Sequence, residues 1–123
     1  MLKMLLLEDD DLSQDVMRRI FKNDFEIDIC ESADEFYEKH SSAEYDIMIV
    51  DVSIKGSING LEFISKIKNS DQYKNIPVIC MTAHAQIKMK QAANEKGADL
   101  FLSKPVSNHI LREAVASLIS KRS

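Results

Sequence analysis

Short apolar runs alternate with amphipathic stretches along the whole chain. Four of the five runs are continuously apolar, which is typical of strands buried on both faces of a sheet. The second run instead sets Phe25, Ile27 and Ile29 against charged neighbours, and this alternation predicts an edge strand with one wetter face. The five runs are Met4–Leu7, Phe25–Cys30, Ile47–Val50, Val78–Met81 and Leu100–Leu102.

An amphipathic, helix-like pattern follows each apolar run. The last pattern is the clearest, and the fourth, around residues 85–96, is the weakest because Ile87 and Ala93 stand among lysines. We therefore expect the fourth helix to be the most mobile of the five and to end in a cap at Gly97. The stripes of the other helices are Leu12, Val16, Met17, Ile20 and Phe21; Ala33, Phe36, Tyr37 and His40; Leu61, Ile64 and Ile67; and Ile110, Leu111, Ala114, Val115, Leu118 and Ile119.

Five strand-then-helix units in succession predict an α/β fold in which helices cover both faces of a parallel sheet. Right-handed crossovers leave few topologies for such a chain. The length of 123 residues fits one domain with its own core, so we expect residues 1–123 to form a single domain. Ligands of such sheets bind beyond the carboxyl ends of the strands, and functional residues are therefore expected directly after each strand.

The charge and the cysteine content narrow the class of protein. The net charge is −4, which argues against a nucleic-acid surface, because such surfaces are normally basic. We recognise no signal peptide and no apolar stretch long enough for a membrane helix, so no membrane contact is expected. Cys30 and Cys80 lie in apolar strand-like runs, which predicts buried free thiols and a cytoplasmic location.

Acidic side chains stand where the first and third runs end. Glu8 and Asp9 directly follow the first run, and Asp51 directly follows the third. Carboxylates gathered at one edge repel one another, and a hard divalent cation relieves this repulsion. We therefore interpret Glu8, Asp9 and Asp51 as a Mg2+ site, and we expect either Asp10 or Asp11 to cap the first helix.

Thr82 follows the fourth run and Lys104 follows the fifth, which adds a hydroxyl and an ammonium group to the same edge. No glycine-rich phosphate-binding loop follows the first strand, and a ring of acids there would repel the phosphates of a nucleotide or a flavin. His40, His84 and His109 are scattered, and each is expected at the surface or at a helix start. Dinucleotide or flavin binding is therefore disfavoured, and no histidine-based catalytic triad can be placed.

Five short motifs, in this order and at this spacing, resemble those of the receiver domain of two-component response regulators. The resemblance covers essentially the whole chain. It implies a single doubly wound (βα)5 flavodoxin-like domain, whose parallel five-stranded sheet has the order 2-1-3-4-5. The motifs are Leu5–Asp10 (LLLEDD), Ile47–Asp51 (IMIVD), Asn59–Glu62 (NGLE), Met81–Ala83 (MTA) and Ser103–Pro105 (SKP).

The resemblance also implies roles for the residues at the strand ends. Asp51 corresponds to the phosphoacceptor of the family. Glu8 and Asp9 correspond to the acidic pair that binds Mg2+ together with the acceptor, and Mn2+ is an expected substitute. The family's third protein ligand is a backbone carbonyl shortly after the acceptor, which in this chain belongs to Ser53.

Three further residues correspond to parts of the family's switch. Thr82 matches the hydroxyl that swings to hydrogen-bond the phosphoryl group, and Lys104 matches the lysine that pairs with a phosphoryl oxygen. Phe101 stands where the family carries an aromatic residue that changes rotamer, and the alternative is that it is a plain core residue. The peptide before Pro105 is commonly cis in relatives.

The loop after the acceptor departs from the family pattern. Lys55 stands where most relatives have a proline, and the loop is one residue longer before Gly60. We expect Gly56 and Ser57 to form a turn that absorbs the extra residue.

Ser53 and His84 occupy positions that tune the lifetime of the phosphorylated state in relatives. Neither is an acid or an amide well placed to hold the attacking water, which leads us to hypothesise an intermediate lifetime.

The leading hypothesis is a Mg2+-dependent phosphoacceptor switch, phosphorylated on Asp51 by a histidine kinase or a histidine phosphotransfer protein. Such a protein is not a conventional enzyme, although it catalyses its own phosphotransfer and slow autodephosphorylation. One alternative is a pseudo-receiver that docks without phosphorylation. Another is a metal-dependent phosphohydrolase with an aspartyl-phosphate intermediate, which would usually need an aspartate where this chain has Ser53.

The face built from the fourth helix, the fifth strand and the fifth helix is where partners or a second copy dock in relatives. Lys88, Lys90 and Lys96 would give this face a basic patch for an acidic partner, or they would form an ordinary solvated helix face. The sequence does not identify the downstream protein target. A phosphorylation-dependent homodimer stays open, as does the choice between a stand-alone receiver and a domain of a longer protein.

Overall fold

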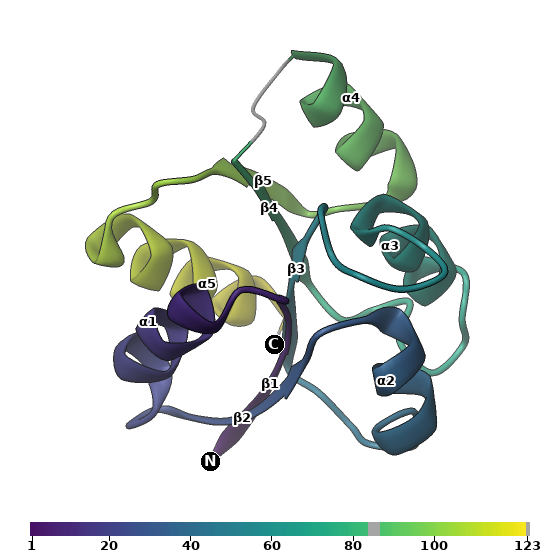
Figure 1. Ribbon diagram of the computed structural model, residues 1–123. Coiled ribbons are helices and arrows are strands. Elements are labelled where there is room, and N and C mark those ends of the chain that lie inside the picture. The colour runs from purple at the N-terminus through teal and green to yellow at the C-terminus, as the bar shows by residue number, and fades with distance from the viewer. Residues whose placement is uncertain (84–86, 123) are drawn as a thin grey trace.

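The computed structural model describes residues 1–83 and 87–122 and shows a five-stranded sheet between two layers of helices (Figure 1). The strands are β1 (Leu2–Leu7), β2 (Phe25–Cys30), β3 (Ile47–Asp51), β4 (Val78–Thr82) and β5 (Leu100–Ser103). The helices are α1 (Asp11–Phe21), α2 (Ala33–Lys39), α3 (Gly60–Lys68), α4 (Ile87–Lys96) and α5 (Asn108–Arg122). Each strand and helix predicted from the hydrophobic pattern is present.

The sheet has the order β2-β1-β3-β4-β5, and all of its neighbouring strands are parallel, as predicted. β2 is an edge strand whose middle residues are half-buried or exposed, which confirms the interpretation of its alternating pattern. β5 was expected to be buried on both faces, and this expectation is wrong. It is the other edge strand and pairs only with β4, so Leu100, Phe101 and Leu102 are only half-buried.

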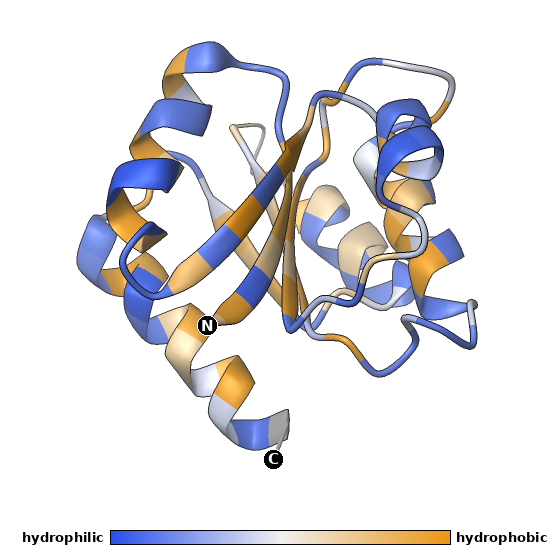
Figure 2. Ribbon diagram, turned by 90° about the horizontal axis from the view of Figure 1, so that it is seen from below, coloured by the Kyte–Doolittle hydropathy of each residue, from blue (hydrophilic) through white to orange (hydrophobic). Residues whose placement is uncertain are grey.

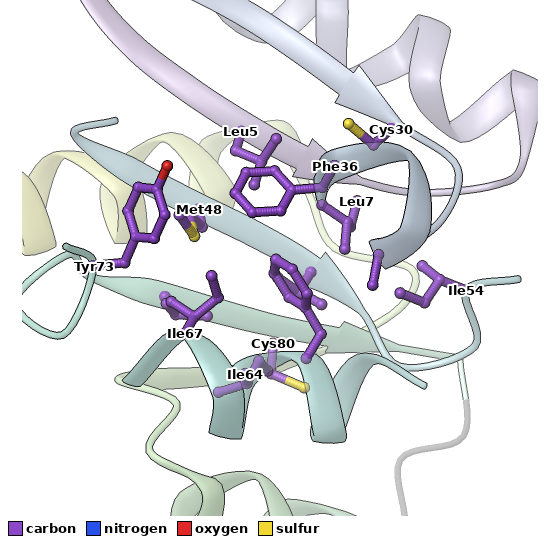
Figure 3. Close-up of a cluster of buried hydrophobic side chains, with 14 of the residues drawn as sticks. Leu5, Leu7, Cys30, Phe36, Met48, Ile54, Ile64, Ile67, Tyr73 and Cys80 are labelled. Carbon is purple, nitrogen blue, oxygen red and sulfur yellow. The ribbon is translucent and has the colours of Figure 1, made fainter. Parts of the chain in front are cut away.

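Successive residues along the strands face opposite layers of the core. Leu5 and Leu7 of β1 pack under α2 and α3, whereas Met4 and Leu6 pack under α1 and α5. The cluster on the α2 and α3 side is drawn in Figure 3 and is rich in aromatic rings around the buried Phe36. Figure 2 shows helices on both sides of the sheet, with hydrophilic residues along their outer surfaces. Two apolar layers therefore hold one sheet in place.

Three residues assigned to apolar helix stripes lie mostly in solvent. Leu12 is 73% exposed in the first turn of α1, where it lines a cavity instead of the core. Ile87 is 79% exposed at the start of α4, and Ile110 is 51% exposed near the start of α5. The helical period shows which residues share a face of the helix. How much of that face is buried depends on the elements that pack against it.

The helix ends follow the expected capping chemistry. Asp10 is the residue that caps α1, since its side chain accepts a hydrogen bond from the backbone N–H of Ser13. Asn59 and Glu62 form a reciprocal capping box at the start of α3. Gly97 has a φ of +104° directly after α4, a conformation that suits glycine, and so confirms the predicted cap.

Cys30 and Cys80 are free and buried, as predicted. Burial raises the pKa of each thiol to about 12, so both stay protonated and unreactive at neutral pH. Among the described residues, no helix combines the length and the apolar character that a bilayer crossing requires.

Candidate functional site

Four polar side chains stand at the carboxyl edge of the sheet. Glu8 directly follows β1, Asp51 ends β3, Thr82 ends β4 and Lys104 directly follows β5. The strand register brings these ends level, because Asp51 pairs with Met81 and Thr82 pairs with the last residue of β5. Residues that are far apart in the sequence therefore meet at one edge, as parallel strands require.

The ammonium group of Lys104 lies between two carboxylates. Its Nζ donates to Glu8 Oε1 and to Asp51 Oδ2, at 2.5 Å in both cases. Glu8 is 4% exposed and Asp51 is 7% exposed, so both carboxylates are largely removed from water. Charge-assisted hydrogen bonds of this kind are stronger than neutral ones, and they hold the two acids side by side.

The protonation of this cluster follows from burial and charge. Burial raises the pKa of Glu8, and the neighbouring Asp51 carboxylate adds to this, while Lys104 acts in the opposite direction. Burial works to lower the pKa of Lys104, but its hydrogen bonds to Asp51 and Glu8 outweigh burial, and the net pKa is raised. Lys104 therefore carries its full positive charge at neutral pH.

Backbone groups fix the two carboxylates. Asp51 Oδ1 accepts a hydrogen bond from the N–H of Ser53 at 2.7 Å, and Glu8 Oε2 accepts one from the N–H of Asp10 at 3.3 Å. Gln14 Nε2 donates to the carbonyl of Glu8 at 2.7 Å, a contact that the sequence pattern did not reveal. The side chains of Glu8 and Asp51 are thus each held by a neighbouring backbone group, which limits their rotamers.

Gly60 allows α3 to begin directly against the end of β3. A Cβ atom at this position would lie 2.3 Å from the carbonyl oxygen of Asp51, a distance that no side chain tolerates. The N–H of Gly60 donates to the carbonyl of Val52 at 3.0 Å. The glycine of the Asn59–Glu62 motif therefore allows the close approach of α3 to the end of β3.

The remaining switch candidates surround this pair. Thr82 is fully buried, and its carbonyl accepts a hydrogen bond from the N–H of Lys104 at 2.8 Å. Phe101 is half-buried and packs against the aromatic cluster on the α2 and α3 side. The peptide between Lys104 and Pro105 is cis, as expected. His84, which was assigned to lifetime tuning, lies outside the described residues.

The donor set suits a small divalent cation without forming a complete cage. Within residues 1–83 and 87–122, no three His, Cys, Asp or Glu side chains gather closely enough to hold a metal ion. Glu8 and Asp51 nevertheless both bind one positive group, the ammonium of Lys104. The half-buried Asp9 follows Glu8 directly. Mg2+ takes few carboxylates and keeps several waters, so this pair of buried acids fits it.

A cavity of about 440 Å³ opens beside these residues. Glu8, Asp51 and Lys104 line it together with apolar side chains of α1, including the exposed Leu12 and Val16. A largely apolar cavity with a few charged groups is typical of a binding site. Apolar side chains of α1 therefore border the charged groups Glu8, Asp51 and Lys104.

The chain matches the family model described as the response regulator receiver domain over residues 4–116. It is 30% identical to hybrid signal transduction histidine kinase I of Dictyostelium discoideum, over 97% of this chain but 7% of that protein. It is 29% identical to a cyclic di-GMP phosphodiesterase of Thermotoga maritima, of which it spans 31%. It is 27% identical to chemotaxis protein CheY of Halobacterium salinarum, over 96% of this chain and 97% of that protein.

Solved structures show the same fold. A two-component response regulator from Clostridium difficile has a TM-score of 0.88 at 22% identity, over 98% of each chain. The receiver domain of sensor histidine kinase PA1611 from Pseudomonas aeruginosa has a TM-score of 0.86 at 18% identity, over 97% of this chain and 98% of that one. That structure holds a magnesium ion coordinated in its active site cleft.

Proposed function

This chain belongs to the family of response regulator receiver domains, and on that premise we propose that it is a Mg2+-dependent switch phosphorylated on Asp51. The observation that carries the proposal is the position of Asp51 at the end of β3, buried and bonded to the ammonium group of Lys104. A carboxylate held in this way presents an oriented oxygen nucleophile next to a fixed positive charge. Phosphoryl transfer requires positioning and charge neutralisation more than it requires an acid or a base.

Glu8, Asp9, Asp51 and the backbone carbonyl of Ser53 are the groups that would hold Mg2+, and Mn2+ would substitute for it. When bound, the metal supplies positive charge to the oxygens of the transferred group. The donor set supports this role, because Glu8 and Asp51 are buried oxygen ligands that already attract one cation.

The phosphodonor in the proposal is a phosphohistidine on a histidine kinase or a histidine phosphotransfer protein. An oxygen of Asp51 forms a bond to phosphorus while the bond from phosphorus to the histidine nitrogen breaks, and that nitrogen keeps the electron pair and takes up a proton. Among the relatives are proteins named as histidine kinases and as a chemotaxis regulator, which supports a donor of this class.

Phosphorylation would redistribute the contacts of Lys104 and Thr82. The product carries a charge of roughly −1.5 to −2 where Asp51 alone carried −1. Lys104, which now bridges two carboxylates, would then pair with a phosphoryl oxygen, and the Thr82 hydroxyl would donate to another. Because Thr82 ends β4 and Lys104 follows β5, the change would reach the α4 side of the molecule, where Phe101 would alter its rotamer.

The proposal also covers the bounds of the domain, its location in the cell and the surface through which it signals. Leu118 and Ile119 pack against the core beyond the span of the family match, so we assign residues 1–123 to one receiver domain. The protein would act in the cytoplasm and would shed its phosphoryl group slowly by itself, with the intermediate lifetime inferred from Ser53 and His84. It would signal to a downstream protein through the face of α4, β5 and α5.

The test is intact-protein mass spectrometry after incubation with acetyl phosphate and Mg2+, with an Asp51→Asn variant as the control. We expect a single phosphoryl adduct on the wild type that depends on Mg2+ and is absent from the variant. A folded wild type that gains no adduct would contradict the proposal, and a receiver that docks without phosphorylation would then be the better reading.

A further inference from the structure

The loop between β3 and α3, residues 52–59, is tied to the start of α2. Ser57 donates its backbone N–H to Asp34 Oδ2 at 3.0 Å and its hydroxyl to Asp34 Oδ1 at 2.8 Å. One carboxylate thus holds both donors of a single serine across a long sequence separation. These two hydrogen bonds hold the pKa of the Asp34 carboxyl below its usual value, so Asp34 stays ionised and accepts both of them.

Gly56 makes this contact sterically feasible. Its φ is +105°, which side chains other than glycine adopt with strain. A Cβ atom on Gly56 would lie 2.5 Å from Asp34 Oδ2 and 3.0 Å from the Cβ of Ser32. The Gly56–Ser57 turn, which the sequence singled out as the place where the longer loop turns, is therefore shaped to fit against α2.

Two further contacts fix the path of the loop. Lys55 forms an isolated parallel bridge with Ser32, the residue that caps α2. Ile54 is buried in the same cluster as Cys30, the last residue of β2 (Figure 3). In the sheet, β1 lies between β2 and β3. The loop that follows β3 therefore reaches across the end of β1 to the end of β2.

We propose that Asp34 is a positioning residue for the metal site, because its hold on Ser57 orders the loop that carries the Ser53 carbonyl. This inference rests on the proposed function, in which that carbonyl is a metal ligand. A loop that is already ordered loses less conformational entropy when its carbonyl binds a cation, so the metal binds more tightly. Ser53 is itself exposed and is held directly by the hydrogen bond from its N–H to Asp51 Oδ1 at 2.7 Å, while the contacts of Ser57 with Asp34 hold the loop beyond it.

Isothermal titration calorimetry with MgCl2 on the unphosphorylated protein tests this role without any activity readout. Ser57→Ala removes one hydrogen bond without a change of charge, and we expect its Kd for Mg2+ to rise about threefold to fivefold. Asp34→Ala should weaken binding at least as much, and adding Ser57→Ala to it should change nothing further, because both act through one contact. Ser57→Thr keeps the hydroxyl and should bind like the wild type.

Ser42→Ala is the matched control, because Ser42 is an exposed serine before β3, at the opposite end of the sheet. Thermal unfolding of each variant checks that it is folded. Wild-type affinity in both Ser57→Ala and Asp34→Ala would overturn the positioning role and leave the phosphoacceptor proposal standing. A wild type that binds no Mg2+ would overturn both proposals. The Asp51→Asn variant shows where the titrated Mg2+ binds, because its loss of binding would assign the calorimetric signal to the site at Asp51.

Discussion

At the scale of single residues, we expect Lys104 to stabilise the cluster at the carboxyl edge of the sheet. It is the cation that the described structure places between the buried acids Glu8 and Asp51. Two buried carboxylates without a cation repel each other and cannot be solvated well. The lysine therefore has a structural task before any phosphoryl group arrives.

We predict that Lys104→Ala lowers the free energy of unfolding by about 3 kcal/mol, because it leaves two buried charges uncompensated. Added Mg2+ should restore more stability to this variant than it adds to the wild type, since the cation would take over the compensation. Urea unfolding with and without MgCl2 measures both effects. Lys74→Ala, which breaks an exposed pair with Asp71, is the control and should change stability by less than about 1 kcal/mol.

At the scale of elements, α1 presents apolar side chains next to Asp51. Leu12 is mostly exposed and Val16 partly so, and both line the cavity that also contains Asp51. In the proposed function, a donor protein would bring its phosphohistidine to Asp51 across this surface. An exposed apolar patch beside a reactive group is typical of a protein-binding site.

We predict that Leu12→Asp slows phosphoryl transfer from a histidine phosphotransfer protein at least tenfold, while labelling by acetyl phosphate stays unchanged. A small donor does not need the apolar contact, whereas a protein donor would lose it and meet a new charge. The ratio of the two labelling rates is the measurement. Ile87→Asp, an equally exposed substitution on α4, should leave both rates as they are, and an equal loss with both donors would refute the assignment.

At the scale of the whole molecule, the site connects to a weakly packed helix. Ala93 is the one residue of α4 that is buried among those described, and this fits the expectation that α4 moves most easily. β4 ends at Thr82, β5 ends next to Lys104, and α4 lies between these two strands in the sequence. In the proposed function, a change at Asp51 would therefore reach α4 through the ends of β4 and β5.

We predict that amide hydrogen exchange is faster in α4 than in the other four helices of the unphosphorylated protein. After phosphorylation with acetyl phosphate, exchange should change in β4, α4 and β5 and stay constant in β2, the edge strand that lies beyond β1 and β3 in the sheet. Exchange followed by mass spectrometry reports both states. Slow exchange throughout α4, or a change confined to β2, would speak against this route.

The chain's own pattern was sufficient for the order of elements and for most of the chemistry at the strand ends. Hydrophobic periodicity is local, and each buried strand or amphipathic helix carries it within its own residues. The order of strands and the meeting of Glu8, Asp51, Thr82 and Lys104 followed from the resemblance and from the geometry of parallel sheets. A cap at Asp10 or Asp11 and a cap at Gly97 were also readable, because a cap depends on the backbone a few residues away, and the structure selected Asp10 for the first of them.

Only the tertiary structure decided what lies against what. It placed the Lys104 ammonium between two acids, left Leu12 in solvent, left the apolar residues of β5 half-buried and joined Ser57 to Asp34. Each of these contacts or exposures depends on segments that are distant in sequence, and no local period records their distances. The sequence by itself therefore determined which groups are available at the carboxyl edge, and packing determined which of them touch.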